Sequence, residues 1–107
     1  MEQAKKVRAL RIVRALVRPD QRADYLRRWW AYVERGRALD ARVWLFEDQA
    51  LPGRFVEFTE YFAEPGMQAR LHGAVTEAGL AEACVRRTGE HERYREVASE
   101  PRGEGSP

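Results

Sequence analysis

The sequence predicts an α+β domain in which an antiparallel β-sheet carries its helices on one face. Two kinds of pattern lead to this fold class. β-branched and aromatic residues alternate with period two over 7–17, 43–47 and 55–62, whereas apolar residues follow helical spacing over 20–39 and 67–78. The 107 residues suit one domain, and the composition, 44% hydrophobic and 34% charged, is that of a globular chain.

The first predicted strand, residues 7–17, has apolar side chains on both faces. Val13 and Val17 share one parity, which Arg11 interrupts, while Ile12 and Leu16 share the other. A strand with this pattern is expected to be covered on both sides.

The first predicted helix, residues 20–39, begins at the stop made by Arg18-Pro19-Asp20. Proline suits the first turn of a helix, and acidic residues there complement the helix dipole. Helical spacing predicts that its buried stripe consists of Ala23, Leu26, Trp30 and Val33, with Trp29 beside it.

Residues 41–62 predict a β-hairpin around Pro52-Gly53. In its first strand Val43 and Leu45 share one face, and Trp44 and Phe46 share the other. Both faces of the second strand are also partly apolar. One layer of helices cannot cover two apolar sheet faces, so we expect a second copy of the chain to cover the other, as a homodimer.

The remainder of the chain predicts a second helix at 67–78, stopped by Gly79, and a short helical piece at 80–88. Residues 91–98 carry alternating charges and favour a short edge strand, although the spacing also fits one long helix from Leu80 to Ala98. The domain is expected to span 1–98, with 99–107 as a disordered tail.

The order strand, helix, strand, strand, helix, strand is that of ferredoxin-like folds. The chain resembles the dimeric α/β-barrel superfamily, which includes antibiotic biosynthesis monooxygenase and NIPSNAP-like domains. The residues that carry the resemblance are Leu16-Val17-Arg18-Pro19 before an aromatic helix at 25–33, the strand Arg54-Phe55-Val56-Glu57-Phe58, the pair Tyr61-Phe62, and His72. The resemblance implies two sheets packed face to face across a dimer, and any ligand pocket between sheet and helices.

Two residues are the catalytic candidates: His72, as a general base or haem ligand, and Tyr61. An ordinary boundary histidine is the alternative for His72. Trp44 and Trp30 suit the lining of an aromatic pocket, but they equally suit core and dimer contacts. Glu60 is either an inward-facing base or a rim carboxylate paired with an arginine such as Arg14. The candidate pocket residues are therefore Trp44, Glu60, Trp30 and Phe58.

Several chemistries lack their motifs. The sequence has no Asn, so the oxygenase-type Asn, Trp and His arrangement is not met, and there is no phosphate-binding Gly-rich loop, Cys cluster or Gly-x-Ser-x-Gly elbow. His91 between Glu90 and Glu92 has undistinguished spacing for a metal site, and Cys84 is expected to be a buried, inert thiol. We expect neither a metal nor a cofactor.

Charge is unevenly divided along the chain. Residues 1–42 hold 12 Lys and Arg against 5 Asp and Glu, and residues 43–107 hold 7 against 12. A solvated helix face with an acidic hairpin and tail explains this, as does a self-complementary dimer, whereas nucleic-acid binding is disfavoured because no aromatic residues interleave with the basic ones. The lone Cys84 fits a reducing cytoplasm, and no signal peptide or membrane span is expected.

Two functions remain open. The first is a dimeric α/β-barrel domain without a catalytic role, binding a hydrophobic small molecule between sheet and helices. The second is a cofactor-free monooxygenase- or isomerase-like enzyme acting on an aromatic or polyketide-like substrate. An electrostatic nucleic-acid binder is the least favoured.

Overall fold

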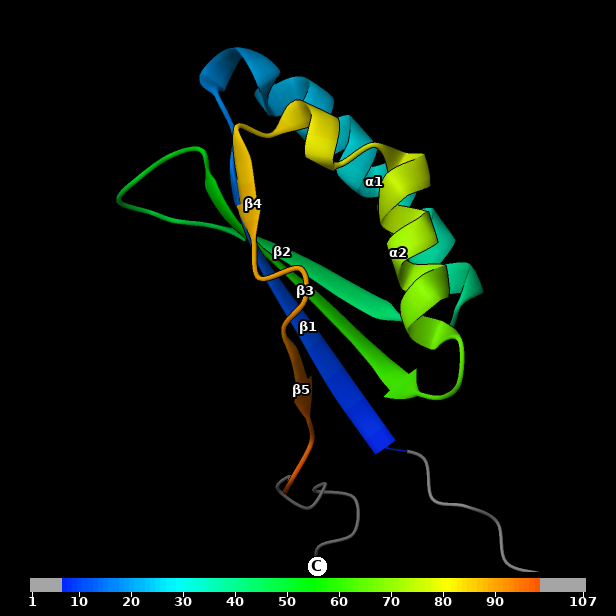
Figure 1. Cartoon of the computed structure of the whole chain (residues 1–107). Coiled ribbons are helices and arrows are strands. Elements are labelled where there is room, and N and C mark those ends of the chain that lie inside the picture. The colour runs from blue at the N-terminus through cyan, green and yellow to red at the C-terminus, as the bar shows by residue number, and fades with distance from the viewer. Residues whose placement is uncertain (1–6, 99–107) are drawn as a thin grey trace, which may run out of the picture.

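The computed structural model describes residues 7–98 and confirms the predicted α+β, ferredoxin-like fold. Its elements are β1 (Val7–Leu16), the 3₁₀ helix η1 (Pro19–Gln21), α1 (Arg22–Ala38), β2 (Arg42–Glu47), β3 (Arg54–Ala63), α2 (Met67–Ala78), the 3₁₀ helix η2 (Ala81–Ala83), β4 (Arg86–Thr88) and β5 (Arg93–Arg95). The strand order is β2-β3-β1-β4, with β5 also paired to β1, and every pairing is antiparallel. Figure 1 shows α1 and α2 on the same side of the sheet.

The two central strands, β1 and β3, pair along their whole length, from Val7 opposite Ala63 to Leu16 opposite Arg54. Because side chains alternate along a strand, this register sorts the residues by parity. Odd-numbered residues over 9–15 and 55–61, such as Val13, face the helices and are buried, and even-numbered residues face the other side.

The last position in the sheet is filled by two short strands instead of one. Residues 14–16 of β1 pair with β4, and residues 9–11 pair with β5. Gly89 lies in the break, at φ +90°, and a Cβ there would come within 2.7 Å of the Ile12 carbonyl oxygen. The break is therefore a position for glycine.

Two predicted elements of the C-terminal part had different outcomes. The prediction of a helical piece at 80–88 is wrong, because only Ala81–Ala83 is helical and Arg86–Thr88 forms β4. The Val85 N–H donates to the Leu16 carbonyl oxygen at 2.7 Å, so pairing with β1 overrides local preference. The edge strand predicted within 91–98 is confirmed, as β5, and the predicted tail at 99–107 lies outside the described residues.

The buried face of α1 differs from the predicted stripe. Ala23 is exposed and Trp30 is 64% exposed, so the stripe was wrong by about one position. The buried residues are Tyr25, Trp29, Tyr32 and Gly36. The two tyrosines are core residues because their hydroxyl groups find polar partners on the sheet.

Polar residues divide the core into two parts. The larger hydrophobic cluster includes Tyr25, Trp29 and Phe55, and the smaller one consists of Ala9, Tyr61, Met67 and Leu71. Between them on the sheet lie Arg11, Glu57 and Thr59, which are 5%, 3% and 3% exposed, and the Arg87 side chain, also 3% exposed, reaches them from β4. We call these four residues the polar belt.

The side of the sheet that bears no helix, the open face, is largely apolar. Leu16, Trp44, Phe46 and Tyr94 are exposed there, and Leu10, Ile12, Val56, Phe58 and Phe62 are partly buried. Among residues 7–98, no element covers this face (Figure 1). No helix in the same range is long and apolar enough to cross a membrane.

Candidate functional site

Two members of the polar belt form a buried ion pair. Arg87 Nη2 donates to Glu57 Oε1 at 2.5 Å, and Arg87 Nη1 donates to Glu90 Oε2 at 2.9 Å. Tyr25 donates its hydroxyl to Glu57 Oε2 at 2.7 Å. The carboxylate and the guanidinium are thus both supplied with partners, which is what makes a buried charge pair tolerable.

This environment shifts the pKa values of nearby groups. Burial, followed by the charge of Glu57, raises the pKa of Tyr25 and raises the pKa of the Cys84 thiol to about 12. Burial lowers the pKa of Arg87, but Glu57 and Glu90 raise it by more. Cys84 is half-buried and not fully buried as expected, and its raised pKa favours the less reactive thiol form at neutral pH.

The third and fourth members of the polar belt sit opposite each other on the central strands. Arg11 of β1 faces Thr59 of β3 in the register, and Thr59 shares a 2.6 Å hydrogen bond with the Tyr32 hydroxyl. Within residues 7–98, the Arg11 side chain forms no hydrogen bond or ion pair, and its Nε is fully buried without a partner. Such a group is rare in a folded protein.

Arg11 lines a hollow of about 310 Å³ between β1, α2 and the segment that joins β4 to β5. We call it the α2 hollow. The other side chains around it come from α2 and from the β4–β5 edge, and they are Gln68, Ala69, His72, Glu90, His91 and Arg93. Except for Ala69, every one of them is polar or charged, so the hollow suits a ligand with a polar group.

Both catalytic candidates lie at or near the α2 hollow. His72 is exposed on α2 and lines the hollow. Tyr61 is buried, and its hydroxyl oxygen accepts a hydrogen bond from Gln68 Nε2, which also belongs to the lining. His72 lies one turn of α2 after Gln68, the residue that bonds to Tyr61.

The four pocket candidates lie elsewhere. Trp44, Glu60 and Phe58 are on the open face, away from the helices, and Trp30 is on the outer side of α1. Glu60 pairs with Arg8 and not with Arg14, and Phe58 packs edge-on against Phe46 at 5.5 Å between ring centroids. The structure therefore does not bring these four residues together with His72.

Sequence reasoning missed Arg11, Gln68 and Arg93 as lining residues. Gln68 and Arg93 carry no distinguishing pattern. Arg11 did carry a signal, because it is the one charge among the inward-facing apolar residues of β1. A charge on the buried parity of a central strand marks a position that needs a partner.

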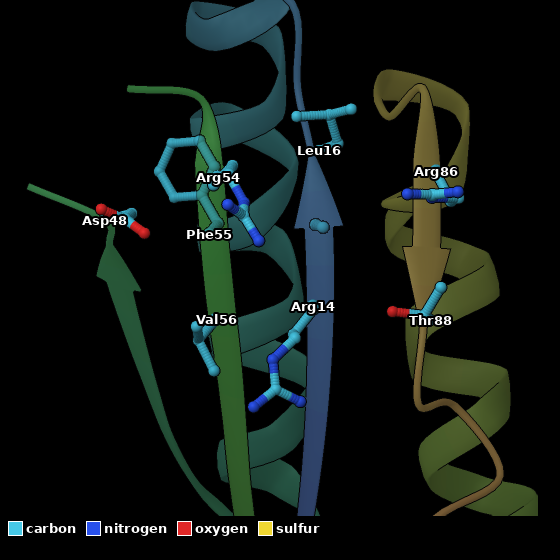
Figure 2. A pocket seen from close by; sticks show the side chains of 9 residues that line it. Arg14, Leu16, Asp48, Arg54, Phe55, Val56, Arg86 and Thr88 are labelled. Carbon is cyan, nitrogen blue, oxygen red and sulfur yellow. The ribbon is translucent and has the colours of Figure 1, made fainter. Parts of the chain in front are cut away.

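A second hollow, of about 410 Å³, lies at one end of the open face. Figure 2 shows Arg14, Arg54 and Arg86 there, from three different strands, beside Leu16 and Val56. None of the three arginines forms an ion pair with another described residue. We call these three arginines the basic end of the open face.

The described residues offer no obvious metal centre. Across residues 7–98, no group of three or more His, Cys, Asp and Glu side chains is placed to hold a metal ion. His91 and Glu90 line the α2 hollow, but Glu90 is engaged by Arg87.

The chain matches no family model and no curated protein sequence, but solved structures share its fold. A protein from Nitrosomonas europaea, described as a candidate antibiotic biosynthesis monooxygenase, is 16% identical with a TM-score of 0.68, and the match covers 95% of this chain and 100% of that one. Another structure described as an antibiotic biosynthesis monooxygenase is 19% identical, with a TM-score of 0.63 and coverages of 87% and 99%. Rv0793 from Mycobacterium tuberculosis is 20% identical, with a TM-score of 0.64 and coverages of 89% and 97%. At these identities the similarity establishes the fold, and it confirms at that level the resemblance seen in the sequence.

Proposed function

We propose that this chain forms a homodimer through its open face and binds a small organic molecule in the α2 hollow. The observation that carries the proposal is the position of Arg11, a buried side chain without a partner among the described residues, beside a hollow that His72 also lines. Fold alone does not set function, so the proposal depends on this site and not on the structural neighbours.

The open face supports the homodimer. Trp44, Phe46 and Leu16 are 41%, 57% and 39% exposed in the single chain, on one continuous sheet surface. Monomeric proteins rarely expose a large contiguous apolar patch, and an interface made by the same patch on both copies closes after two subunits.

The α2 hollow supports a small ligand with a polar group. Its volume of about 310 Å³ is at the lower end of the range of about 300–1,000 Å³ for small-molecule sites. The expected hydrophobic ligand fits less well, because apolar lining is scarce there. It fits only if the molecule also carries a polar group directed at Arg11.

Catalysis is the second candidate, and His72 favours it. An exposed histidine and a largely buried guanidinium line the same hollow, so a ligand there could meet both a proton acceptor and a group that stabilises negative charge. That pair suits removal of a proton from an acidic C–H group, the first step of an isomerisation or of a cofactor-free oxidation. Two of the structural neighbours are described as monooxygenases.

The homodimer is tested by sedimentation velocity at micromolar concentration. A species of twice the chain mass is expected, and a species of the single chain mass would refute it. Ligand binding is tested by recording ¹H–¹⁵N spectra of the full chain with benzoate and with benzamide. At least one of them must shift the amide signals of α2 and of residues 90–93.

The enzymatic candidate is tested by oxygen uptake with anthrone as the probe. In the reaction the anthrone CH₂ group becomes a carbonyl, O₂ supplies its oxygen atom, and the second oxygen atom leaves as water. We expect uptake above the protein-free rate that falls at least tenfold in His72→Gln. Oxygen uptake equal to that of buffer alone would refute the enzymatic candidate, and ligand binding without catalysis would remain as the proposed function.

A further inference from the structure

We propose that the ligand of the α2 hollow carries a compact anionic group, a carboxylate or a phosphate, and that Arg11 binds it. This inference rests on the proposed function, because it takes the α2 hollow as the binding site and names the chemical class of its ligand.

The first argument comes from the hydrogen bonds of the polar belt. Its two guanidinium groups are both buried, but only Arg87 bonds to carboxylates, those of Glu57 and Glu90. Glu57 also accepts the hydroxyl hydrogen of Tyr25, and neither of its oxygen atoms bonds to Arg11. The Nε of Arg11 is buried and has no acceptor among residues 7–98, and burial of a polar N–H group without an acceptor is unfavourable. An anion from outside the described chain would supply the missing acceptor.

The second argument comes from the register of β1 and β5. Arg11 is directly opposite Arg93, and both side chains line the α2 hollow. Like charges at directly opposite positions of an antiparallel pair destabilise it. An anion bound between the two guanidinium groups would reduce this repulsion. The repulsion is a reason for an anion that does not depend on the missing hydrogen bond of Arg11.

The other lining side chains agree with an anion. Glu90 is the acidic residue of the lining, and it is held by Arg87. His72 and His91 add donors on the open side of the hollow. A guanidinium binds carboxylate and phosphate groups with two parallel hydrogen bonds, and arginine is therefore the basic residue best suited to this role.

The test measures the affinity of the full-length protein for benzoate, benzamide and inorganic phosphate by ¹H–¹⁵N NMR titration at constant ionic strength and pH 7. Benzoate and benzamide have nearly the same shape, but only benzoate is charged. We expect benzoate to bind at least tenfold more tightly than benzamide, with shifts in residues 68–72 and 90–93.

The phosphate titration distinguishes a phosphate group from a carboxylate group on the ligand. Competition between phosphate and benzoate for the same signals supports a shared anion site, with the tighter binder showing whether the group is a phosphate or a carboxylate. Equal affinity for benzoate and benzamide would overturn the inference and leave the proposed function standing. No shift with benzoate, benzamide or phosphate would overturn both.

Variants assign the effect to Arg11. Arg11→Gln should weaken benzoate binding at least tenfold without changing benzamide binding, and Arg37→Gln, at an exposed position of α1 that does not line the hollow, should change neither. If Arg11→Gln does not fold, Arg93→Gln at an exposed position replaces it, with an expected loss of at least threefold.

Melting temperatures distinguish a ligand-binding role of Arg11 from a structural one. If Arg11 serves to bind a ligand, Arg11→Met should raise the melting temperature of the ligand-free protein and abolish its stabilisation by benzoate. A lower melting temperature together with unchanged benzoate binding would overturn the inference.

Discussion

In a simple globular protein the covered face of a sheet is apolar and the uncovered face is polar, whereas here each face carries side chains of the other kind. The face under the helices buries Arg11, Glu57 and Arg87, whereas the face without helices exposes Trp44 and Phe46. Each face thus carries side chains that residues 7–98 leave without a partner or a cover, Arg11 under the helices and Trp44 and Phe46 on the open face. The buried charges indicate a site, and the exposed apolar residues indicate a surface that another molecule covers.

The largest expected effect comes from breaking the buried ion pair. Arg87→Met leaves the Glu57 carboxylate, 3% exposed, without its cation, and should lower the free energy of unfolding by about 3–5 kcal/mol. Urea unfolding at one fixed protein concentration, followed by tryptophan fluorescence, measures it.

The double variant Glu57→Leu/Arg87→Met is the matched control, because it removes both charges and should regain most of the loss. On the open face, Glu60→Gln breaks the solvent-exposed pair with Arg8 and should change stability little. An equal loss of stability in Arg87→Met and in Glu60→Gln would remove the contrast between the two faces.

The next effect concerns the open face. Trp44→Glu places a charge on the proposed interface and should weaken dimer association about 100-fold, with the fold retained. Trp30→Glu makes the same change at a more exposed tryptophan on the outside of α1 and should leave association unchanged. Sedimentation over a concentration series compares them, and equal behaviour of the two variants would argue against a dimer through the open face.

A smaller effect separates two tyrosines. Tyr25→Phe removes the hydroxyl that donates to buried Glu57 and should lower the free energy of unfolding by about 1.5 kcal/mol. Tyr94→Phe removes an exposed hydroxyl that donates to Glu92, and its stability should match that of the wild type. Chemical unfolding of both variants, side by side, checks the difference; a loss confined to Tyr94→Phe would contradict it.

The smallest effect is on thiol reactivity. Because the pKa of Cys84 is raised to about 12, its thiolate fraction at any pH is below that of a free cysteine, and its rate with a disulfide reagent should still be rising at pH 10. A thiol placed on α1 by Ala23→Cys, in a Cys84→Ala background, is exposed and away from the open face, and its rate should instead reach a plateau near pH 9. A reaction rate of Cys84 itself that reaches a plateau near pH 9 would show that burial does not raise the pKa of this thiol.

Much of the fold could be predicted from local pattern, and the exceptions have physical causes. The hairpin and the order of elements follow from alternation and from breakers such as Pro52-Gly53. The phase of α1 was missed because Tyr25 and Tyr32 are buried through hydroxyl contacts with the sheet, which no hydropathy pattern contains. β4 was missed because it is too short to show a period and depends on pairing with β1.

The candidate site could be predicted only in part. His72 and Tyr61 lie at or near the α2 hollow, but parity alone could not show which face of the hairpin meets the helices. Trp44 and Glu60 were therefore placed together with residues from the opposite side of the sheet. The interruption at Arg11 was visible in the sequence, but its significance depends on the lack of a described partner, which only a structure can show.

The break at Gly89 affects how the molecule meets its neighbours. A continuous outer strand along β1 would offer a long row of unpaired backbone groups, on which another chain could add as a further strand. Division into β4 and β5, of three residues each, interrupts that row. Gly89 has a φ of +90°, which other residues adopt only with strain. Replacing it would therefore favour a different backbone conformation between β4 and β5. The segment between β4 and β5, which contributes to the α2 hollow, therefore also shortens the strand edge to which another chain could add.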